Sequence, residues 1–347
     1  MSEHHGAIHA RRIGRIVLFA ATASLLVLTA ISSLVVGQFE FSPGELWPIL
    51  TAGPMSASTL EASVLWQIRI PRLVLGLCVG AALGTGGALM QSVFANPLAE
   101  PSVVGVSTGA GVGAAIATVF GITTFGTMTV PIFAFATGIF VTVVVYQLAR
   151  SGGRVRVLNL VLVGIAANAI CGACISALTF IAPTTAREQI VFWQMGSLAG
   201  ASWAQTGVVA AVVTFALACA MCFVRKLDIL ALGDQAAFHV GINVARLRML
   251  AIALSTLLTA AAVSFAGLIG FVGLVVPHIV RTAVGPSNTV LVPASALGGA
   301  LLIGAGDILS RTIIPFADLP IGIFTALIGG PTFFFLLRQM MRKGHTQ

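Results

Sequence analysis

The side chains best suited to metal or redox chemistry in this sequence are its five cysteines, Cys78, Cys171, Cys174, Cys219 and Cys222. Four of them form two pairs with C-x-x-C spacing, which is found at metal sites and in redox-active motifs. Both pairs lie inside apolar runs, and neither has a histidine or an acidic residue close by in the sequence. We therefore interpret the cysteines as small apolar residues and expect no metal site.

The sequence lacks the usual signatures of an energy source or of an enzyme. It contains no G-x-x-x-x-G-K-[ST] phosphate loop, and its only lysines are Lys226 and Lys343. An H-E-x-x-H motif is absent as well, and the spacing G-x-S-x-G occurs at residues 105–109, inside a glycine-rich apolar run. Ion-coupled carriers usually place an acidic residue at mid-membrane. Here the acids lie at the ends of apolar runs or in loops: Glu100, Asp228, Asp234, Asp307 and Asp318. We expect neither an enzyme nor a cofactor bound by this chain.

Two amides lie inside apolar runs, where an unpaired polar group is costly. Gln91 is close to the end of one run, and Asn168 is in the middle of another. Either could line a transport pathway. Each could instead make a hydrogen bond between helices, which is the commoner use of an amide in this setting. The sequence leaves both interpretations open.

Composition places these residues in a membrane. Hydrophobic residues make up 58% of the 347 residues and charged residues only 8%, whereas charged residues are about a quarter of an ordinary soluble domain. The net charge of +8 does not indicate nucleic acid binding, because the basic residues lie at the ends of apolar runs rather than in a stripe. We predict an all-α polytopic membrane protein, and a single integral membrane domain over residues 1–347.

Apolar runs of the length that crosses a bilayer predict about ten membrane-spanning helices. The first, Ile16–Val36, is too long for the apolar part of a signal peptide and lacks a cleavage site, so we expect it to be retained. Two surface helices are also expected, Phe41–Thr51 in the polar loop Gln38–Gln67 and one within Thr184–Trp203. The other predicted spans are Leu73–Phe94, Val103–Phe120, Val130–Ala149, Val157–Ile181, Gly207–Val224, Met249–Phe265, a segment ending at Arg281, Val292–Leu309 and Ile321–Met340.

An even number of spans places both termini on one side, and the basic residues indicate which side. Of the 18 lysines and arginines, 14 fall on the side of the termini, and the other four are Arg69, Arg72, Arg187 and Arg311. The positive-inside rule predicts that the richer side is cytoplasmic. Residues 1–15 are then a cytoplasmic tail, and 228–246 a cytoplasmic segment with a short helix over Gln235–Val240, capped by Asp234 and Gly241.

Glycines recur every four residues on two neighbouring predicted helices. Gly76, Gly80 and Gly84 share one helix face, and Gly105, Gly109 and Gly113 share a face of the next helix. Lipid provides no hydrophobic drive for helix association, so small residues that allow close backbone approach take its place. We expect both rows to be helix–helix packing surfaces.

Several long motifs together resemble one family, the FecCD or type II permease subunits of ABC importers for iron chelates, haem and vitamin B12. The resemblance covers the chain from about Arg69 onward. The motifs that carry it are RIPR, GAALGTGGALMQSVFANPLAEPSVVGVSTGAG, LALGDQAAFHVG, FVGLVVPHIVR, GDILSR and LPIGIFTALIGGPTFFFLLR.

The resemblance implies a type II ABC importer permease fold and a set of partners. These are a second permease copy, two cytoplasmic ATPase subunits that hold ATP-Mg, an external substrate-binding protein and membrane lipid. It also implies roles for motif residues. Arg69, Arg72 and Arg311 would dock the binding protein, and the segment with Leu232, Gly233, Asp234, Ala237 and Gly241 would couple to the ATPase. A ferric siderophore or haem is the expected substrate; vitamin B12 import and an ion-coupled carrier are the alternatives.

Overall fold

The computed structural model describes residues 2–39, 41, 43–54, 59–151 and 154–344. It is helical apart from one small hairpin, in which β1 (Arg150–Ser151) pairs antiparallel with β2 (Arg154–Val155). The α-helices are α1 (Ser2–Val35), α2 (Pro43–Ala52), α3 (Leu60–Ser63), α4 (Ile70–Phe94), α5 (Val106–Val119), α6 (Thr129–Leu148), α7 (Val157–Ile181), α8 (Thr184–Met195), α9 (Trp203–Met221), α10 (Val224–Leu230), α11 (Asp234–His239), α12 (Val244–Ala266), α13 (Val272–Val284), α14 (Asn288–Ser310) and α15 (Ile321–Gly344).

The predicted spans correspond to helices of the structure. In the described residues, seven helices are long and apolar enough to cross a membrane. The remaining predicted spans correspond to the shorter apolar helices α5 and α13 and to the apolar part of α15, Ile321–Phe335. The predicted surface helices are present as α2 and α8, and the predicted short helix as α11. The all-helical membrane fold is therefore confirmed.

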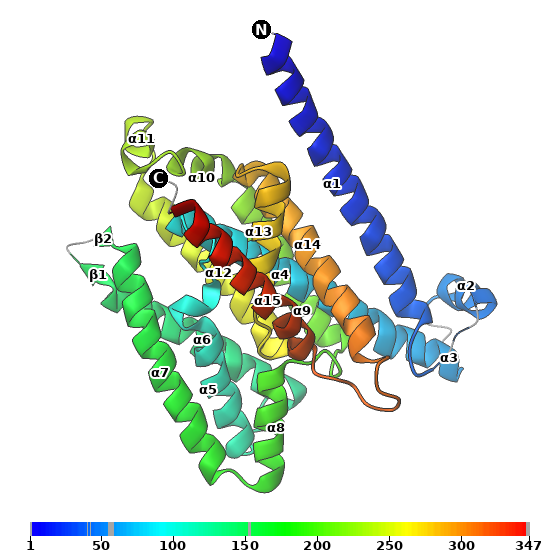
Figure 1. Cartoon of the computed structure of the whole chain (residues 1–347). Helices are drawn as coiled ribbons and strands as arrows, with labels where there is room; N and C mark the ends of the chain where they lie inside the picture. Colours follow the sequence, from blue (N-terminus) through cyan, green and yellow to red (C-terminus); the bar gives the residue numbers. More distant parts are fainter. Residues whose placement is uncertain (1, 40, 42, 55–58, 152–153, 345–347) are drawn as a thin grey trace.

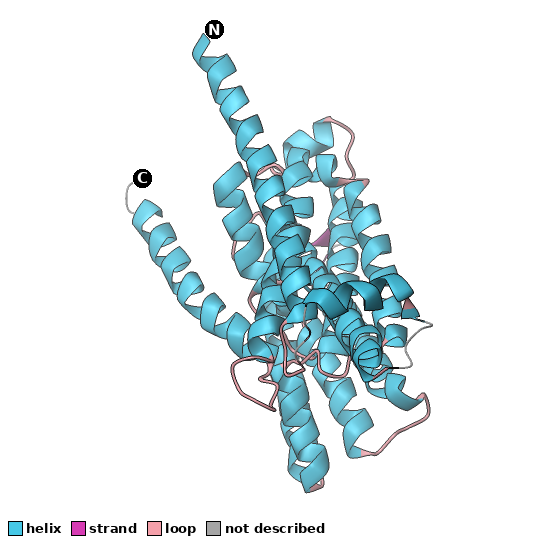
Figure 2. Ribbon diagram, turned by 90° about the vertical axis from the view of Figure 1, so that its right-hand side faces the viewer, coloured by secondary structure: helices cyan, strands magenta, loops and turns pink. Residues whose placement is uncertain are grey.

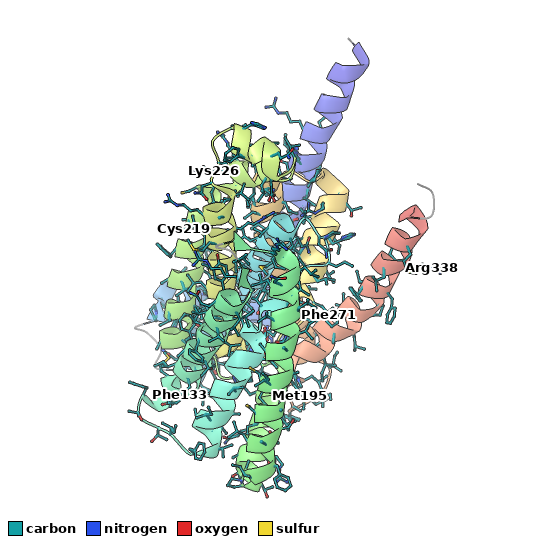
Figure 3. All side chains as sticks on the ribbon, turned by 90° about the vertical axis from the view of Figure 1, so that its left-hand side faces the viewer. Phe133, Met195, Cys219, Lys226, Phe271 and Arg338 are labelled. Atoms are coloured by element: carbon teal, nitrogen blue, oxygen red, sulfur yellow. The ribbon has the colours of Figure 1, made fainter. Side chains whose placement is uncertain are left out.

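Both termini lie at the same end of the bundle, together with α10 and α11, and we name this the terminal end (Figure 1). The opposite end, named the distal end, carries α8 and the loop between α14 and α15 (Figure 1). Figure 3 shows the same polarity from another side, with Lys226 toward the terminal end and Phe133 and Met195 toward the distal end.

The central helix is α4, against which α14, α12, α13 and α9 pack. In the most apolar 18 residues of Leu60–Phe94, the segment that includes α4, 72% of the residues are buried. In the corresponding part of α1 only 6% are buried, because α1 runs along the periphery of the bundle. Helix α15 diverges from the bundle toward its C-terminal end (Figure 2). The chain is thus a layer of helices around α4, with α1 and α15 as outlying helices.

The predicted glycine rows are packing surfaces. A Cβ atom added at Gly80 would lie 2.1 Å from the backbone oxygen of Gly299 on α14, and one at Gly84 would lie 2.1 Å from that of Ser295. On α5, a Cβ at Gly113 would lie 2.3 Å from the backbone oxygen of Phe133 on α6. Since these obstacles are backbone atoms, no rotamer change can relieve them, and only glycine permits such close helix pairs.

The second span begins earlier than predicted. The predicted polar loop extends to Gln67 and the predicted span starts at Leu73, but a helix starts at Leu60 and passes through a π-helical turn, Val64–Arg69, into α4. In that turn the Ile70 N–H donates to the carbonyl of Leu65, five residues back. Pro71 has no N–H, so it cannot donate a hydrogen bond to a carbonyl of the preceding turn. The π-helical turn lies directly before this proline.

Three other predicted boundaries are wrong by a few residues. The third span does not start as a regular helix at Val103, because a 3₁₀ turn, Pro101–Val104, precedes a left-handed Gly105 with φ of 83°. Helix α12 begins at Val244 rather than Met249, capped by Asn243, whose side chain accepts from the Arg246 N–H at 3.0 Å. Asp234 is not the cap of α11 but its first residue, and Gly233 precedes it with φ of 112°.

Candidate functional site

The three arginines predicted to dock a binding protein lie together at the distal end, and all are buried. Their exposed fractions are 4% for Arg69, 7% for Arg72 and 6% for Arg311. Together with Asp307 and Asp318 they form a group that we name the distal charge cluster. In the isolated chain these arginines are committed to internal contacts, so the docking role stays a prediction.

Arg72 is the central member of the distal charge cluster. Its Nε donates to Asp307 Oδ1 at 2.9 Å, and its Nη1 donates to Asp318 Oδ2 at 2.7 Å. These bonds join α4 to α14 and to the loop that follows α14. Asp307 is shared, because its other oxygen lies 3.6 Å from Arg311 Nε, one helical turn further along α14. The pairing of Asp307 with Arg311 is the one expected from their spacing of four residues.

The other two arginines hold the C-terminal end of α1. Arg311 Nη2 donates to the backbone oxygen and the hydroxyl of Ser33, both at 2.7 Å. Arg69 donates to the carbonyls of Leu34, Val35 and Phe39, and its guanidinium stacks 4.6 Å from the centre of the Phe41 ring. The distal charge cluster therefore joins α1, α4, α14 and the α14–α15 loop. With three guanidiniums and two carboxylates, it keeps an excess positive charge.

The fourth distal arginine, Arg187 of α8, caps a helix. It donates to the carbonyls of Thr179 at 3.2 Å and Ala182 at 3.3 Å, where α7 ends. A cation at a helix C-terminus is favourable because the unpaired carbonyls there carry partial negative charge.

At the terminal end, residues 228–246, which we name the coupling segment, include α11 and the turns around it. Three large apolar side chains are exposed here: Leu232 at 77%, Phe238 at 74% and Val240 at 67%. Gly233 and Gly241 both have positive φ, 112° and 79°, which only glycine adopts at little cost. Ala237 is fully buried on the inner face of α11, where that helix packs against the rest of the protein.

Two carboxylates fasten the coupling segment to different spans. Asp228 accepts from the backbone N–H of Asn288 and from the Ser287 hydroxyl, the latter at 3.1 Å, at the start of α14. Asp234 receives two hydrogen bonds from Arg248 of α12, at 2.8 and 3.0 Å. Both α12 and α14 pack on α4, so the two links connect the coupling segment to helices that contact the central helix.

Gln91 and Asn168, the two amides inside apolar runs, make hydrogen bonds to neighbouring segments of the bundle. Gln91 Nε2 donates to the carbonyls of Gly273 at 3.3 Å and Leu274 at 3.2 Å. Asn168 of α7 accepts from the Thr108 hydroxyl at 2.6 Å and donates to the Ser102 carbonyl at 3.2 Å. This is one of the two interpretations that the sequence left open. A role for either amide in lining a pathway stays a prediction.

The cysteines are free thiols on three different helices. Within the described ranges, no group of three histidine, cysteine, aspartate or glutamate side chains is placed to hold a metal ion. No sequence pattern indicates the links of Asp228 to α14 or of Arg69 to the end of α1, since their partners lie 60 and 35 residues away.

A family model for the FecCD transport family matches residues 25–339. The chain belongs to the FecCD transport family. Its relatives include the hemin transport system permease protein HmuU of Yersinia pestis, 36% identical, with 92% of this chain and 95% of that protein covered. Another is the cobalamin import system permease protein BtuC of Halobacterium salinarum, 40% identical over 86% of this chain and 81% of the relative. The resemblance recognised from the motifs is confirmed.

Solved structures agree with this FecCD assignment. A metal-chelate type ABC transporter in an inward-facing conformation superposes with a TM-score of 0.82 at 32% identity, over 93% of this chain and 99% of that one. PsaBC from Streptococcus pneumoniae matches at a TM-score of 0.56 and 15% identity over 76% of this chain, a likeness of fold alone. This chain is therefore a membrane-spanning permease of the FecCD family.

Proposed function

We propose that this chain is the membrane-spanning subunit of an ABC importer that carries an iron chelate, a ferric siderophore or haem, across the cytoplasmic membrane. It acts as a dimer, of identical or pseudo-symmetric subunits, with two ATPase subunits that hold ATP-Mg and an external binding protein. The terminal end is cytoplasmic in this proposal, in keeping with its excess of basic residues.

The observation that carries the proposal is the exposed apolar surface of the coupling segment. Leu232, Phe238 and Val240 project from a short helix and its turns, beyond the long apolar helices that contact lipid. Apolar side chains exposed at a polar end of a molecule are typical of a protein-binding surface. Because the sequence has no phosphate loop of its own, a partner that hydrolyses ATP is the occupant that the transport function requires.

The two carboxylate links explain how such a partner would drive transport. A rigid-body displacement of the coupling segment pulls α12 through the Asp234–Arg248 pair and α14 through the bond between Asp228 and Asn288. Closely packed helices move as discrete bodies rather than deforming continuously. Movement at the ATPase surface is thus converted into movement of the helices around α4.

The test is transport into vesicles reconstituted with the permease, its ATPase and its binding protein. Ferric siderophore, haem and cobalamin are offered as labelled substrates, with ATP inside, without ATP, and with an imposed proton or sodium gradient. The proposal predicts ATP-dependent uptake of an iron chelate. Uptake driven by a gradient in the absence of ATP would instead establish an ion-coupled carrier.

A matched pair of variants tests the coupling surface in the same vesicles. Phe238→Ser should weaken ATPase binding and reduce uptake at least about tenfold, as expected for truncating a central aromatic contact. The control is Trp47→Ser on α2, since Trp47 is equally exposed, 71% against 74%, and follows the distal end of α1. Equal loss of ATPase binding in both variants would contradict the assignment of the surface.

Cobalamin is the second candidate substrate, because one relative of this chain is described as a cobalamin import permease and is 40% identical. The same vesicles decide between the substrates. Saturable uptake of cobalamin without uptake of any ferric chelate would replace the iron assignment and leave the rest of the proposal in place.

We also propose that the binding protein docks over the distal charge cluster. The excess of one positive charge there would steer acidic side chains, and such charges affect association rate more than affinity. Asp318→Asn tests this without removing a buried arginine. Neutralising this partly exposed carboxylate should speed association at low salt, and the gain should shrink as salt rises. Slower association, or a gain independent of salt, would contradict docking at this surface.

A further inference from the structure

A second charged feature lies where α1 meets α13 at the terminal end, next to the coupling segment. A cavity of about 1060 Å³ opens there. Its lining includes Arg15 of α1, Arg281 of α13, Gly285 just after α13, Asn96 of the turn after α4, and Asp228 and Leu232 of the coupling segment. Helix α1 diverges from the bundle toward its N-terminus (Figure 1), and the cavity lies on the inner side of this divergence.

The two arginines of this cavity have buried N–H groups that lack a hydrogen-bond partner. These are Nε of Arg15 and both Nε and Nη2 of Arg281. Unsatisfied donors on a charged group are costly to bury. In the distal charge cluster Nε of Arg311 also lacks a hydrogen bond, but Arg311 lies 3.6 Å from Asp307 and Arg72 has two carboxylate partners. The Arg15–Arg281 pair therefore has the donors of an anion site but no anion supplied by the protein.

One carboxylate, that of Asp228, also lines the cavity. It is already engaged by the Asn288 N–H and the Ser287 hydroxyl, at the positive end of α14. It is therefore not paired with either guanidinium, and the cavity keeps a net positive charge.

The surroundings of the cavity are apolar and face outward. Ile16 and Val17, next to Arg15 on α1, are 60% and 58% exposed, and Ile279 on α13 is 55% exposed. In a protein that spans a membrane, such side chains contact lipid chains. The cavity thus lies between two helices whose outer faces contact lipid.

We propose that the cavity binds the phosphate headgroup of an anionic phospholipid, wedged between α1 and α13 in the leaflet at the terminal end. Basic pockets between membrane helices are known to take anionic headgroups, and arginine binds phosphate through paired donors. The acyl chains extend from the cavity toward the lipid-facing sides of α1 and α13. The bound lipid would bridge the two helices at Arg15 and Arg281.

The test uses the full-length chain in neutral detergent. No charged bilayer surface is present there, so lipid retention depends on direct contacts between the lipid and the protein. Retention of dioleoyl-phosphatidylglycerol is measured by native mass spectrometry against dioleoyl-phosphatidylcholine. Arg15→Gln combined with Arg281→Gln should weaken retention of the anionic lipid at least roughly 30-fold, as expected for the loss of two charge-assisted hydrogen-bonding groups. The control is Arg12→Gln, an exposed arginine on the same helix that does not line the cavity.

Unchanged retention in the double variant, or an equal loss in Arg12→Gln, overturns the site. If the double variant does not fold, Arg15→Gln alone carries the test, because it lies on the peripheral helix. Displacement of the lipid by millimolar inorganic phosphate would identify a free-anion site instead of a lipid site. Loss of the lipid on adding the partner ATPase would assign the cavity to a protein interface.

Discussion

The two carboxylates that accept hydrogen bonds from Arg72 differ in burial. Removing the charge of either one should therefore lower the free energy of unfolding by a different amount. The Asp307 side chain is 4% exposed and serves both Arg72 and Arg311, whereas that of Asp318 is 29% exposed and serves Arg72 alone. Asp307→Asn leaves two buried guanidiniums without a charged partner in α14. Removing one partner of a buried ion pair costs about 3–5 kcal/mol. Asp318→Asn, which water partly compensates, should cost about 1 kcal/mol.

Thermal unfolding of the full-length chain in neutral detergent measures this difference through the fluorescence of its four tryptophans. At roughly 2–4 °C per kcal/mol, the value for soluble domains of 150–250 residues, Asp307→Asn should lower the Tm by at least about 6 °C and Asp318→Asn by about 2–4 °C. Asp234→Asn is a control, since that side chain is 57% exposed at the other end of the molecule. Equal shifts for Asp307→Asn and Asp318→Asn would refute the view that burial and sharing set the cost.

Three further predictions follow from the packing, the coupling segment and the orientation. Gly80→Ala should destabilise the fold by about 3 kcal/mol, since its Cβ would meet the Gly299 backbone oxygen at 2.1 Å. The control is Gly172→Ala, which has no atom within 4 Å of the added Cβ and should leave stability unchanged. Equal Tm values for the two variants would contradict close packing of α4 on α14. Asp234→Ala should cost under about 1 kcal/mol of stability, because the Asp234–Arg248 ion pair is exposed. It should nevertheless reduce uptake per ATP hydrolysed severalfold. An unchanged ratio of uptake to ATP hydrolysis would show that the link to Arg248 transmits no movement. Asn96 is exposed in the turn after α4, where Ala99 is buried, so a cysteine in place of Asn96 is open to reagents. Because this turn is cytoplasmic in the proposed orientation, Asn96→Cys should resist an impermeant external thiol reagent in intact cells. Rapid labelling would reverse the proposed orientation.

Much of the fold could be predicted because membrane helices are set by local composition. Apolar length located the spans, and the four-residue spacing of Gly76, Gly80 and Gly84 indicated a packing face. The pairing of Asp307 with Arg311 could also be predicted, since it needs only one helical turn. The family, too, was evident from contiguous motifs such as RIPR and LALGDQAAFHVG.

Other features depend on which helices become neighbours, which no local pattern specifies. Arg69 and Arg72 were expected at a surface, because arginines at the end of an apolar run usually reach water or lipid headgroups. They are buried because α1, α14 and the α14–α15 loop supply carbonyls and carboxylates from distant parts of the chain. The π-helical turn before α4 likewise had no signal beyond Pro71.

The sequence by itself determined the class of protein, the approximate spans, the short α11 helix and the family, since these depend on composition, short-range periodicity and contiguous motifs. Only the tertiary structure decided that Asp228 and Asp234 tie the coupling segment to two different helices, and that Arg15 and Arg281 face one cavity. The physical reason is that a hydrogen bond or ion pair forms wherever packing brings complementary groups within about 3 Å. Packing of apolar helices against α4 joins residues regardless of their separation along the chain.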